Sequence, residues 1–121
     1  MNPDEASSQI AYMREGAVSD RFLGDLNELF HVKARLGIMT LLLSQGETDF
    51  STLKSRLGLT DGNLGAHIRV LEKAGYLTVV KSFVGRRPRT ACQVSEAGRR
   101  AFAEYLRQLE AVIRLVDPKE E

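Results

Sequence analysis

Residues 57–77 read LGLTDGNLGAHIRVLEKAGYL, and they contain the start, the buried face and the end of one helix. Thr60 is a favourable N-cap, and Asp61 stands at the positive end of the helix dipole. One apolar stripe at helical spacing should face a core: Leu64, Ile68 and Leu71. Gly75 supplies a left-handed C-terminal turn, so the sequence predicts a helix over Asp61–Ala74.

A second short helix precedes this one. Phe50, Leu53 and Leu57 mark one helical face after Asp49, and Gly58 ends the helix. Only the residues Gly58-Leu59-Thr60 separate the two helices. Two short helices joined by such a turn fit a helix-turn-helix.

Two strand-like runs follow, Leu77–Val84 and Thr90–Val94, on either side of the loop Gly85–Arg89. Together they predict a β-hairpin, with Pro88 at the turn or at a strand end because it lacks an amide hydrogen. The loop reads GRRPR and brings three guanidinium groups together. The planar Arg fork suits phosphate, so the loop indicates contact with nucleic acid.

Helical patterns also flank this region. They cover Asp20–Phe30, then Lys33–Leu43 up to a glycine stop at Gly46, and finally a long helix capped by Ser95 and running to about Val116. The resulting order is four helices, two strands and a long helix. It predicts a mainly α (α+β) fold: a winged helix-turn-helix with a two-stranded β-hairpin wing and additional N- and C-terminal helices for dimerisation.

The net charge of +1 conceals a strong asymmetry along the 121 residues. Residues 61–100 hold eight basic and three acidic side chains, a net charge of +5, whereas residues 1–32 sum to −4. The positive charge is concentrated where the helix and the hairpin lie. This distribution is the electrostatic footprint of a protein that binds a polyanion.

The sequence gives little support to other classes of protein. Cys92 is the single cysteine, which excludes an intrachain disulfide and a cysteine-based metal cluster. Residues 1–8 lack a secretory signal, and the apolar block Ile38–Leu43 is far shorter than the roughly 20 residues of a membrane span. Neither a catalytic triad nor a phosphate-binding glycine loop is recognisable. We expect a cytoplasmic protein that is not an enzyme and needs neither metal nor cofactor.

Three segments together resemble a known family: Leu57–Leu64, His67–Leu77 and Gly85–Thr90. They are similar to small prokaryotic winged-helix transcriptional regulators related to the MarR and ArsR regulators. The resemblance spans roughly His31 to Leu106, and the pair LTDGNL and GRRPRT is its most specific part. It implies a homodimer on double-stranded DNA, with helix 61–74 in the major groove and wing residues 85–89 on the backbone or minor groove.

The resemblance also implies which residues contact DNA. On and before the helix these are Thr60, Gly62, Asn63, Gly65, Ala66, His67 and Arg69. On the wing they are Arg86, Arg87 and Arg89, and we also expect Lys81 on the preceding strand to contact DNA. Many relatives carry Ser in place of Gly65 and a basic or amide residue in place of Ala66. Both departures remove hydrogen-bonding groups from the face that reads bases.

Several residues also have simpler interpretations. Asn63 either pairs with an adenine edge or caps the start of the helix. His67 lies off the apolar stripe and should be exposed, where it contacts DNA or is merely solvated. The Arg loop is a phosphate contact or a solubilising tip. Cys92 is a small buried hydrophobe or, less in keeping with a strand position, a redox sensor.

The long C-terminal helix carries a stripe of apolar residues three and four apart, a spacing typical of a seam between helices. DNA half-sites favour two-fold symmetry, so a dimer seam is preferred over a ligand pocket. We expect the interface to contain Leu23, Leu26, Phe30, Phe102, Tyr105, Leu109, Val112 and Val116. A small-molecule effector is compatible with this fold, but no residue pattern identifies one.

The expected domain is a winged-helix DNA-binding domain over residues 20–117, with the dimerisation helix at about 95–116. Residues 1–19 are expected to be a flexible or dimer-associated segment. The expected function is a homodimeric DNA-binding transcriptional regulator. The alternative is a winged-helix protein-interaction module whose basic wing meets an acidic partner. RNA binding is less favoured, because the hairpin region offers only Phe83 and Tyr76 as stacking aromatics.

Overall fold

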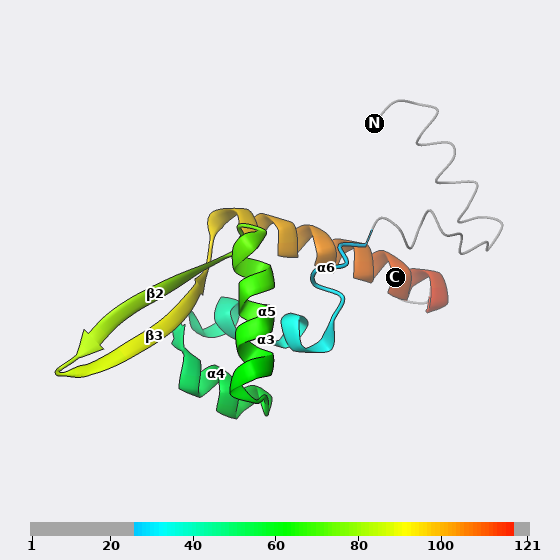
Figure 1. The fold of residues 1–121 in the computed structure, drawn as a ribbon. Coiled ribbons are helices and arrows are strands. Elements are labelled where there is room, and N and C mark those ends of the chain that lie inside the picture. Colours follow the sequence, from blue (N-terminus) through cyan, green and yellow to red (C-terminus); the bar gives the residue numbers. More distant parts are fainter. Residues whose placement is uncertain (1–25, 118–121) are drawn as a thin grey trace. The chain divides into compact units, whose positions relative to one another are not determined.

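The computed structural model describes residues 26–117 (Figure 1). The chain divides into two compact units: one is Glu28–Glu104, and the described part of the other comprises residues 26–27 and 105–117. The helices and strands, in chain order, are α3 (Lys33–Gln45), β1 (Thr48–Asp49), α4 (Phe50–Leu57), α5 (Asp61–Lys73), β2 (Leu77–Val84), β3 (Arg87–Val94) and α6 (Glu96–Val116). Within the described residues, no helix is both long and apolar enough to cross a membrane.

The helix-turn-helix is confirmed, with α4 and α5 separated by a short turn. The Asp49 carboxylate accepts a hydrogen bond from the Thr52 amide at 2.7 Å and caps α4. The Thr60 hydroxyl accepts one from the Asn63 amide at 3.1 Å and caps α5. Both side chains satisfy amides that a helix leaves without a partner at its first turn.

The end of α5 is also as predicted, with Gly75 in the left-handed region at a φ of +85°. The Tyr76 amide donates to the Leu71 carbonyl at 2.9 Å, and the Gly75 amide donates to the Glu72 carbonyl at 2.9 Å. These two bonds define a Schellman turn, which glycine adopts without steric cost. The turn directs the chain straight into β2.

The wing belongs to a three-stranded antiparallel sheet in the order β1-β3-β2. In β1, Thr48 pairs with Cys92 and Asp49 pairs with Ala91. The expected wing had two strands, so β1 was missed. A strand of two residues has no periodicity of its own, and it exists only through its pairing with β3.

The hairpin turn is shorter than the predicted five-residue loop. β2 and β3 remain paired as far as Val84 and Arg87, so only Gly85 and Arg86 form the turn. Gly85 has a φ of +64°, the conformation that a two-residue hairpin turn requires at its first central position. Residues 87–89, expected in the loop, are therefore the beginning of β3.

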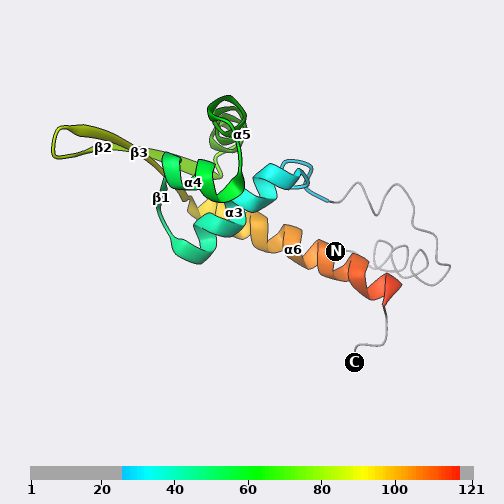
Figure 2. The ribbon, with the colours of Figure 1, turned by 90° about the horizontal axis from the view of Figure 1, so that it is seen from below.

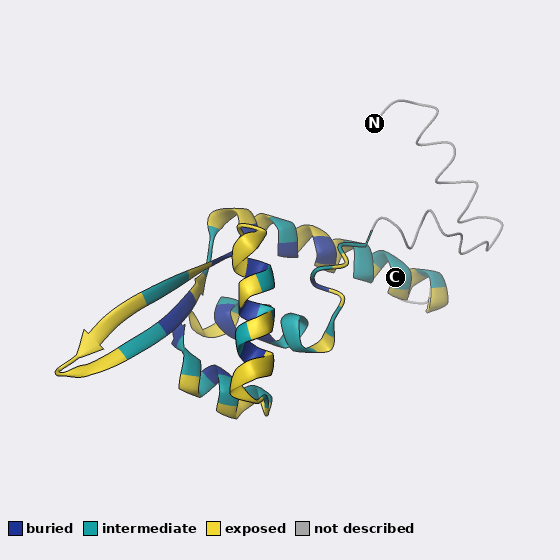
Figure 3. Cartoon of the chain, in the orientation of Figure 1, coloured by how far each residue is buried: buried dark blue, intermediate teal, exposed yellow. Residues whose placement is uncertain are grey.

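The core of the unit 28–104 lies between the helices and the base of the hairpin. Figure 3 shows buried residues on the inner sides of the helices, whereas the outer part of the hairpin is exposed. Buried apolar side chains from all three short helices include Ile38, Met39, Leu42, Leu53, Leu64, Ile68 and Leu71. Burial of one such side chain contributes about 1.5–3 kcal/mol, so this core fixes the position of α5.

The predicted helix over Asp20–Phe30 is wrong in its described part. Residues 26–30 form a bend and turns, and the His31 amide donates to the Glu28 carbonyl at 3.2 Å; residues 20–25 lie outside the described residues. The Phe30 ring is buried, 5.0 Å from the Tyr76 ring and 5.2 Å from the Phe102 ring. The apolar residue at this position anchors an aromatic cluster instead of continuing a helical stripe.

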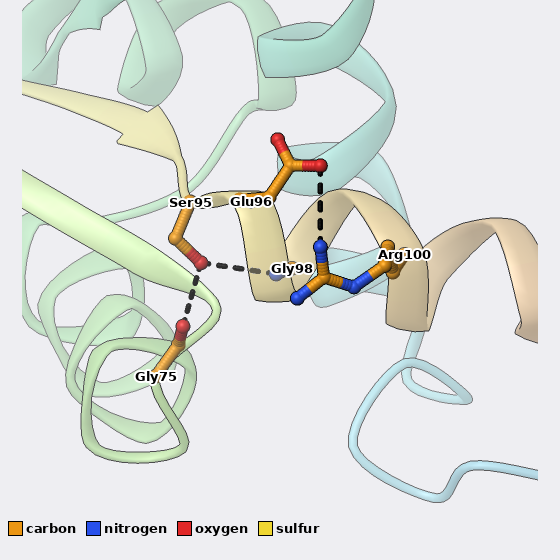
Figure 4. Close-up of polar contacts among 5 residues, drawn as sticks. All are labelled: Gly75, Ser95, Glu96, Gly98 and Arg100. Atoms are coloured by element: carbon orange, nitrogen blue, oxygen red, sulfur yellow. Dashed lines mark hydrogen bonds and ion pairs between the residues drawn. The ribbon is translucent and has the colours of Figure 1, made fainter.

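A compact polar clamp joins the start of α6 to the end of α5 (Figure 4). The Ser95 hydroxyl donates to the Gly75 carbonyl at 2.6 Å and accepts from the Gly98 amide at 3.0 Å, which confirms Ser95 as the N-cap. The Ser95 amide donates to the Tyr76 carbonyl at 3.0 Å. Gly98 lies so close to the Tyr76 backbone that a Cβ atom would overlap its carbonyl oxygen.

Candidate nucleic-acid interface

α5 has a buried face and an outer face. Its buried face is the apolar stripe of the helix-turn-helix core. A rotation of 100° per residue places a second set of residues on the opposite side of the helix. These residues are exposed and either small or basic: Gly62, Ala66, Arg69 and Lys73. A polyanionic surface can therefore approach this side of the helix closely and meet two cations there.

A groove of about 510 Å³ runs between α5 and the hairpin. Gly65 and Arg69 line it from the helix, and Lys81 and Thr90 line it from the strands, with Glu72 as an acidic neighbour. A Cβ atom on Gly65 would lie 3.4 Å from a guanidinium nitrogen of Arg69. Gly65 thus faces the hairpin, and α5 and the wing border one groove.

His67 is not the exposed residue that the sequence predicts. It is half-buried, and its Nδ1 atom accepts a hydrogen bond at 3.2 Å from Nε of Arg35 on α3. Arg35 also donates to the Leu29 carbonyl at 3.3 Å. Burial, and then the nearby Arg35 charge, lower the pKa of His67 below its ordinary value. His67 therefore ties α5 to α3 as a neutral ring.

Thr60 and Asn63 have different roles at the start of α5: Thr60 caps the helix, and the Asn63 side chain does not. The cap at the start of α5 is made by the Thr60 hydroxyl, which accepts from the backbone amide of Asn63. The Asn63 side chain is exposed and makes no hydrogen bond within residues 26–117. Its amide group remains available to a ligand, because the capping task falls to Thr60.

The charged side chains of the wing are all basic. Residues 77–94 hold four basic side chains and no acidic one. Arg86 and Arg87 are exposed at the tip, and the hairpin projects away from the helices (Figures 1 and 2). Unopposed cations on a projecting hairpin are well placed to meet phosphates.

Arg89 differs from the other two wing arginines. Its guanidinium lies 2.9 Å from a carboxylate oxygen of Glu47, and both side chains are partly exposed. Its charge also helps to lower the pKa of Asp49, after two hydrogen bonds from Thr52. Because Arg89 already has acidic neighbours within the chain, Arg86 and Arg87 carry most of the unpaired charge of the predicted loop.

Asp61, at the start of α5, is an acidic residue next to the outer face. The Lys54 ammonium group lies 3.0 Å from its carboxylate, with both side chains largely exposed. Such a surface pair adds at most about 1 kcal/mol to stability. Its local effect is to offset the negative charge that Asp61 would present to a polyanion.

A family model described as a winged helix DNA-binding domain matches residues 34–113. The chain belongs to this family. A winged-helix DNA-binding protein of the regulator type is a binding protein and not an enzyme, in agreement with the sequence.

Three known proteins are similar to this winged-helix protein. The uncharacterized protein MJ0432 of Methanocaldococcus jannaschii is 34% identical over 82 residues, or 68% of this chain and 89% of the relative. The structure of a transcriptional regulator homologue protein from Pyrococcus horikoshii OT3 has 35% identity and a TM-score of 0.74, covering 80% of this chain and 98% of that chain. A MarR-family transcriptional regulator from Rhodococcus sp. RHA1 shares the fold, with 19% identity and a TM-score of 0.58, covering 97% of this chain and 83% of that chain. The predicted resemblance to winged-helix transcriptional regulators is thus confirmed, and the fold is shared with a MarR-family structure.

Three residues expected at the dimer interface are buried within the winged-helix chain itself. Phe30, Phe102 and Tyr105 are each at most 3% exposed, and burial raises the pKa of the Tyr105 hydroxyl. Sequence spacing could not separate them from surface residues, because a core stripe and an interface stripe have the same period.

The large apolar side chains that α6 exposes lie in its C-terminal half. Leu106, Ile113 and Val116 are 45%, 60% and 81% exposed. Leu109 and Val112 are half-buried, as is Leu26, while Leu23 lies outside the described residues. Leu106 and Ile113 are seven residues apart, which places them on one side of the helix.

Lys73 is an outer-face residue that is missing from the predicted DNA contacts. It follows Ala66 by seven residues, so helical periodicity alone puts it on the outer face. Cys92 is fully buried, and burial, followed by the Glu72 charge, raises the pKa of its thiol to about 11. A buried thiol that stays protonated behaves as a small hydrophobe, the simpler of its two interpretations.

Proposed function

We propose that the protein is a homodimeric transcriptional regulator that inserts α5 into the major groove of DNA. Its wing then follows the flanking backbone and minor groove. The observation that carries this proposal is the groove that Gly65 and Arg69 of α5 and Lys81 and Thr90 of the basic hairpin border, next to the exposed outer face of α5. A helix with side chains is about 10–12 Å wide and the major groove is about 12 Å wide, so α5 fits that groove.

The proposed contacts divide by chemistry. Asn63 and Arg69 carry the amide and guanidinium groups that pair with base edges, whereas Lys73, Lys81, Arg86 and Arg87 meet phosphates. Gly62 and Ala66 let the backbone of α5 approach the bases, and they contribute no hydrogen bond. Few side chains on α5 can read bases, so DNA shape at the wing contributes to the choice of site.

The proposed dimer forms through the exposed apolar residues of α6. Leu106, Ile113 and Val116 recur at helical spacing, and a second copy would remove them from water. A two-fold dimer places two α5 helices on half-sites about one turn of DNA apart, which predicts a roughly palindromic site. In this proposal α6 is the dimerisation helix, and the protein acts in the cytoplasm on chromosomal DNA.

The salt dependence of binding tests the proposal. If a dimer neutralises roughly eight phosphates, log K falls against log salt with a slope of about −7. The probe is a duplex selected from a random-sequence library by the wild-type protein, with affinity measured by fluorescence anisotropy. Arg86→Ala/Arg87→Ala should flatten the slope to roughly −3 to −4, because each lost phosphate contact changes it by about 0.9 in each of two wings.

Two controls sharpen this test. Arg89→Ala should flatten the slope less, because Arg89 is already paired with Glu47. Arg100→Ala removes one charge per chain from α6, as Arg89→Ala does from the wing; Arg100 pairs with Glu96 at 3.3 Å, and its loss should leave the slope unchanged. An unchanged slope in the double variant would remove the wing from the mechanism. Selection of no duplex at moderate salt would refute DNA binding and favour an acidic protein partner.

A further inference from the structure

The wing tip exposes two large apolar side chains that the proposed phosphate contacts do not explain. Phe83 is 72% exposed and Val84 is 61% exposed, whereas Leu77 at the base of the same hairpin is buried. Single exposed apolar residues are common on protein surfaces. A large aromatic ring held far from the core, at the end of a paired hairpin, is a candidate contact surface.

The register of the hairpin shows which way Phe83 faces. Phe83 pairs with Pro88, and two residues nearer the base Lys81 pairs with Thr90. Side chains alternate along a strand, so these two pairs lie on the same face. Lys81 and Thr90 line the groove between the hairpin and α5. The Phe83–Pro88 pair therefore continues that face outward, beyond the reach of α5.

Phe83 and Pro88 form one compact apolar cross-strand pair. The pair next to the turn, Val84 and Arg87, is the hydrogen-bonded pair of a two-residue hairpin, so Phe83 and Pro88 form a non-hydrogen-bonded pair. Side chains are closest in such pairs, and the absent amide hydrogen of Pro88 removes no bond to β2. Proline thereby stiffens the strand behind the phenylalanine ring.

The residues around the Phe83–Pro88 pair are basic. Arg86 lies beyond it at the turn, Lys81 flanks it toward the base on the same face, and no acidic residue occurs between Glu72 and Glu96. The proposed occupant must therefore combine negative charge with apolar surface. The minor groove of DNA does so, since phosphates line its edges while sugars and base edges form its walls and floor. Proteins that enter this groove use Phe and Pro side chains as wedges between base steps.

We propose that Phe83, supported by Pro88, is an apolar wedge that enters the minor groove beside the α5 site and partly opens a base step. This inference rests on the proposed function, because it requires α5 to dock in the adjacent major groove. Arg86 at the turn and Lys81 toward the base of the hairpin hold the phosphates on either side of the wedge. Pyrimidine–purine steps open most easily, so the wedge adds a sequence preference that the small residues of α5 do not supply.

The test compares Phe83→Ala with Val84→Ala, a matched variant on the opposite face of the same hairpin. The probe is the duplex selected by the wild-type protein, with affinity measured across salt concentrations and DNA bending measured by energy transfer between its labelled ends. Phe83→Ala should weaken binding about tenfold at every salt concentration and reduce the bend, with the salt slope unchanged. An apolar contact releases no counterions, which separates this effect from that of the arginines. Val84→Ala should leave affinity and bend unchanged.

Three outcomes would overturn the wedge while leaving the proposed function intact. The first is wild-type affinity and bending in Phe83→Ala. The second is a flattened salt slope, which would mean that Phe83 merely positions the cations. The third is a change of oligomeric state in sedimentation, which would assign Phe83 to a contact between copies. Unchanged thermal unfolding of both variants establishes that the fold is retained, and failure of the wild-type protein to select any duplex would instead refute the proposed function.

Discussion

At Gly98 the absence of a side chain allows α6 to begin directly against the chain reversal that follows α5. The glycine lies on the carbonyl of Tyr76, and its amide donates to the capping Ser95 hydroxyl. Any Cβ atom at this position meets backbone, which cannot move aside as a flexible side chain can. This glycine has a packing reason, unlike Gly62 on the outer face of α5.

Gly98→Ala should therefore lower the free energy of unfolding by at least about 2 kcal/mol through overpacking. Gly62→Ala is the matched control, because a Cβ atom there meets nothing within 4 Å. The control should gain up to about 1 kcal/mol from helix propensity. Urea denaturation followed by circular dichroism measures both changes, and wild-type stability of Gly98→Ala would show that α6 is not seated on Tyr76.

The Arg35–His67 contact makes stability depend on pH in a defined window. The pKa of His67 is lowered in the folded state, so the unfolded chain binds its proton more readily. This contribution to stability is fully present above the ordinary pKa of 6.5 and is lost as pH falls through the lowered folded value. The pKa of Asp49 is lowered from 3.8, so this carboxylate affects the pH dependence of stability only at more acidic pH.

We expect the urea concentration at the unfolding midpoint of the wild-type protein to decrease as the pH is lowered from about 7 to about 5. His67→Gln keeps a side-chain acceptor for Arg35 but cannot take up the proton, so this part of the pH dependence should disappear. Denaturation curves at a series of pH values measure it. Identical pH profiles for the two proteins would mean that His67 titrates alike in the folded and unfolded chain.

At the scale of elements, local signals predicted the helix-turn-helix well. Thr60 and Gly75 act within their own helix ends, so the bounds of α5 could be predicted from residues a few positions apart. β1 could not, because its two residues are defined by partners on β3 more than 40 positions away. Long-range pairing leaves no trace in a short window of sequence.

The site shows the same division between local and distant information. The outer face of α5 follows from helical period, and Gly62, Ala66 and Arg69 were placed correctly in the exposed set. His67 was misplaced because its partner, Arg35, lies 32 residues earlier in the chain. Arg89 was treated as equivalent to its neighbours because its pairing with Glu47 spans 42 residues. Charge composition identified the wing, and only the register separated its faces.

For the whole molecule, the exposed apolar stripe of α6 predicts the oligomeric state. Ile113→Glu would place a charge in the middle of the proposed seam, where desolvation is costly. We expect this variant to sediment as a monomer at micromolar concentrations at which the wild-type protein is a dimer, and to bind the selected duplex more weakly. Arg100→Glu, which puts the same side chain on the far side of α6, should remain dimeric. Dimeric Ile113→Glu would exclude this seam.

The two-residue turn at Gly85 has a consequence for how far the wing extends. Strand faces alternate with a period of two, so one residue added to each strand would exchange the side chains of the two faces at the new tip. Phe83 would keep its face, but the residues beyond it would present the wrong chemistry to the partner. The length of the wing can therefore change only in steps of two residues per strand, which is about 7 Å at a time. Among relatives, wing lengths should differ by even numbers of residues per strand.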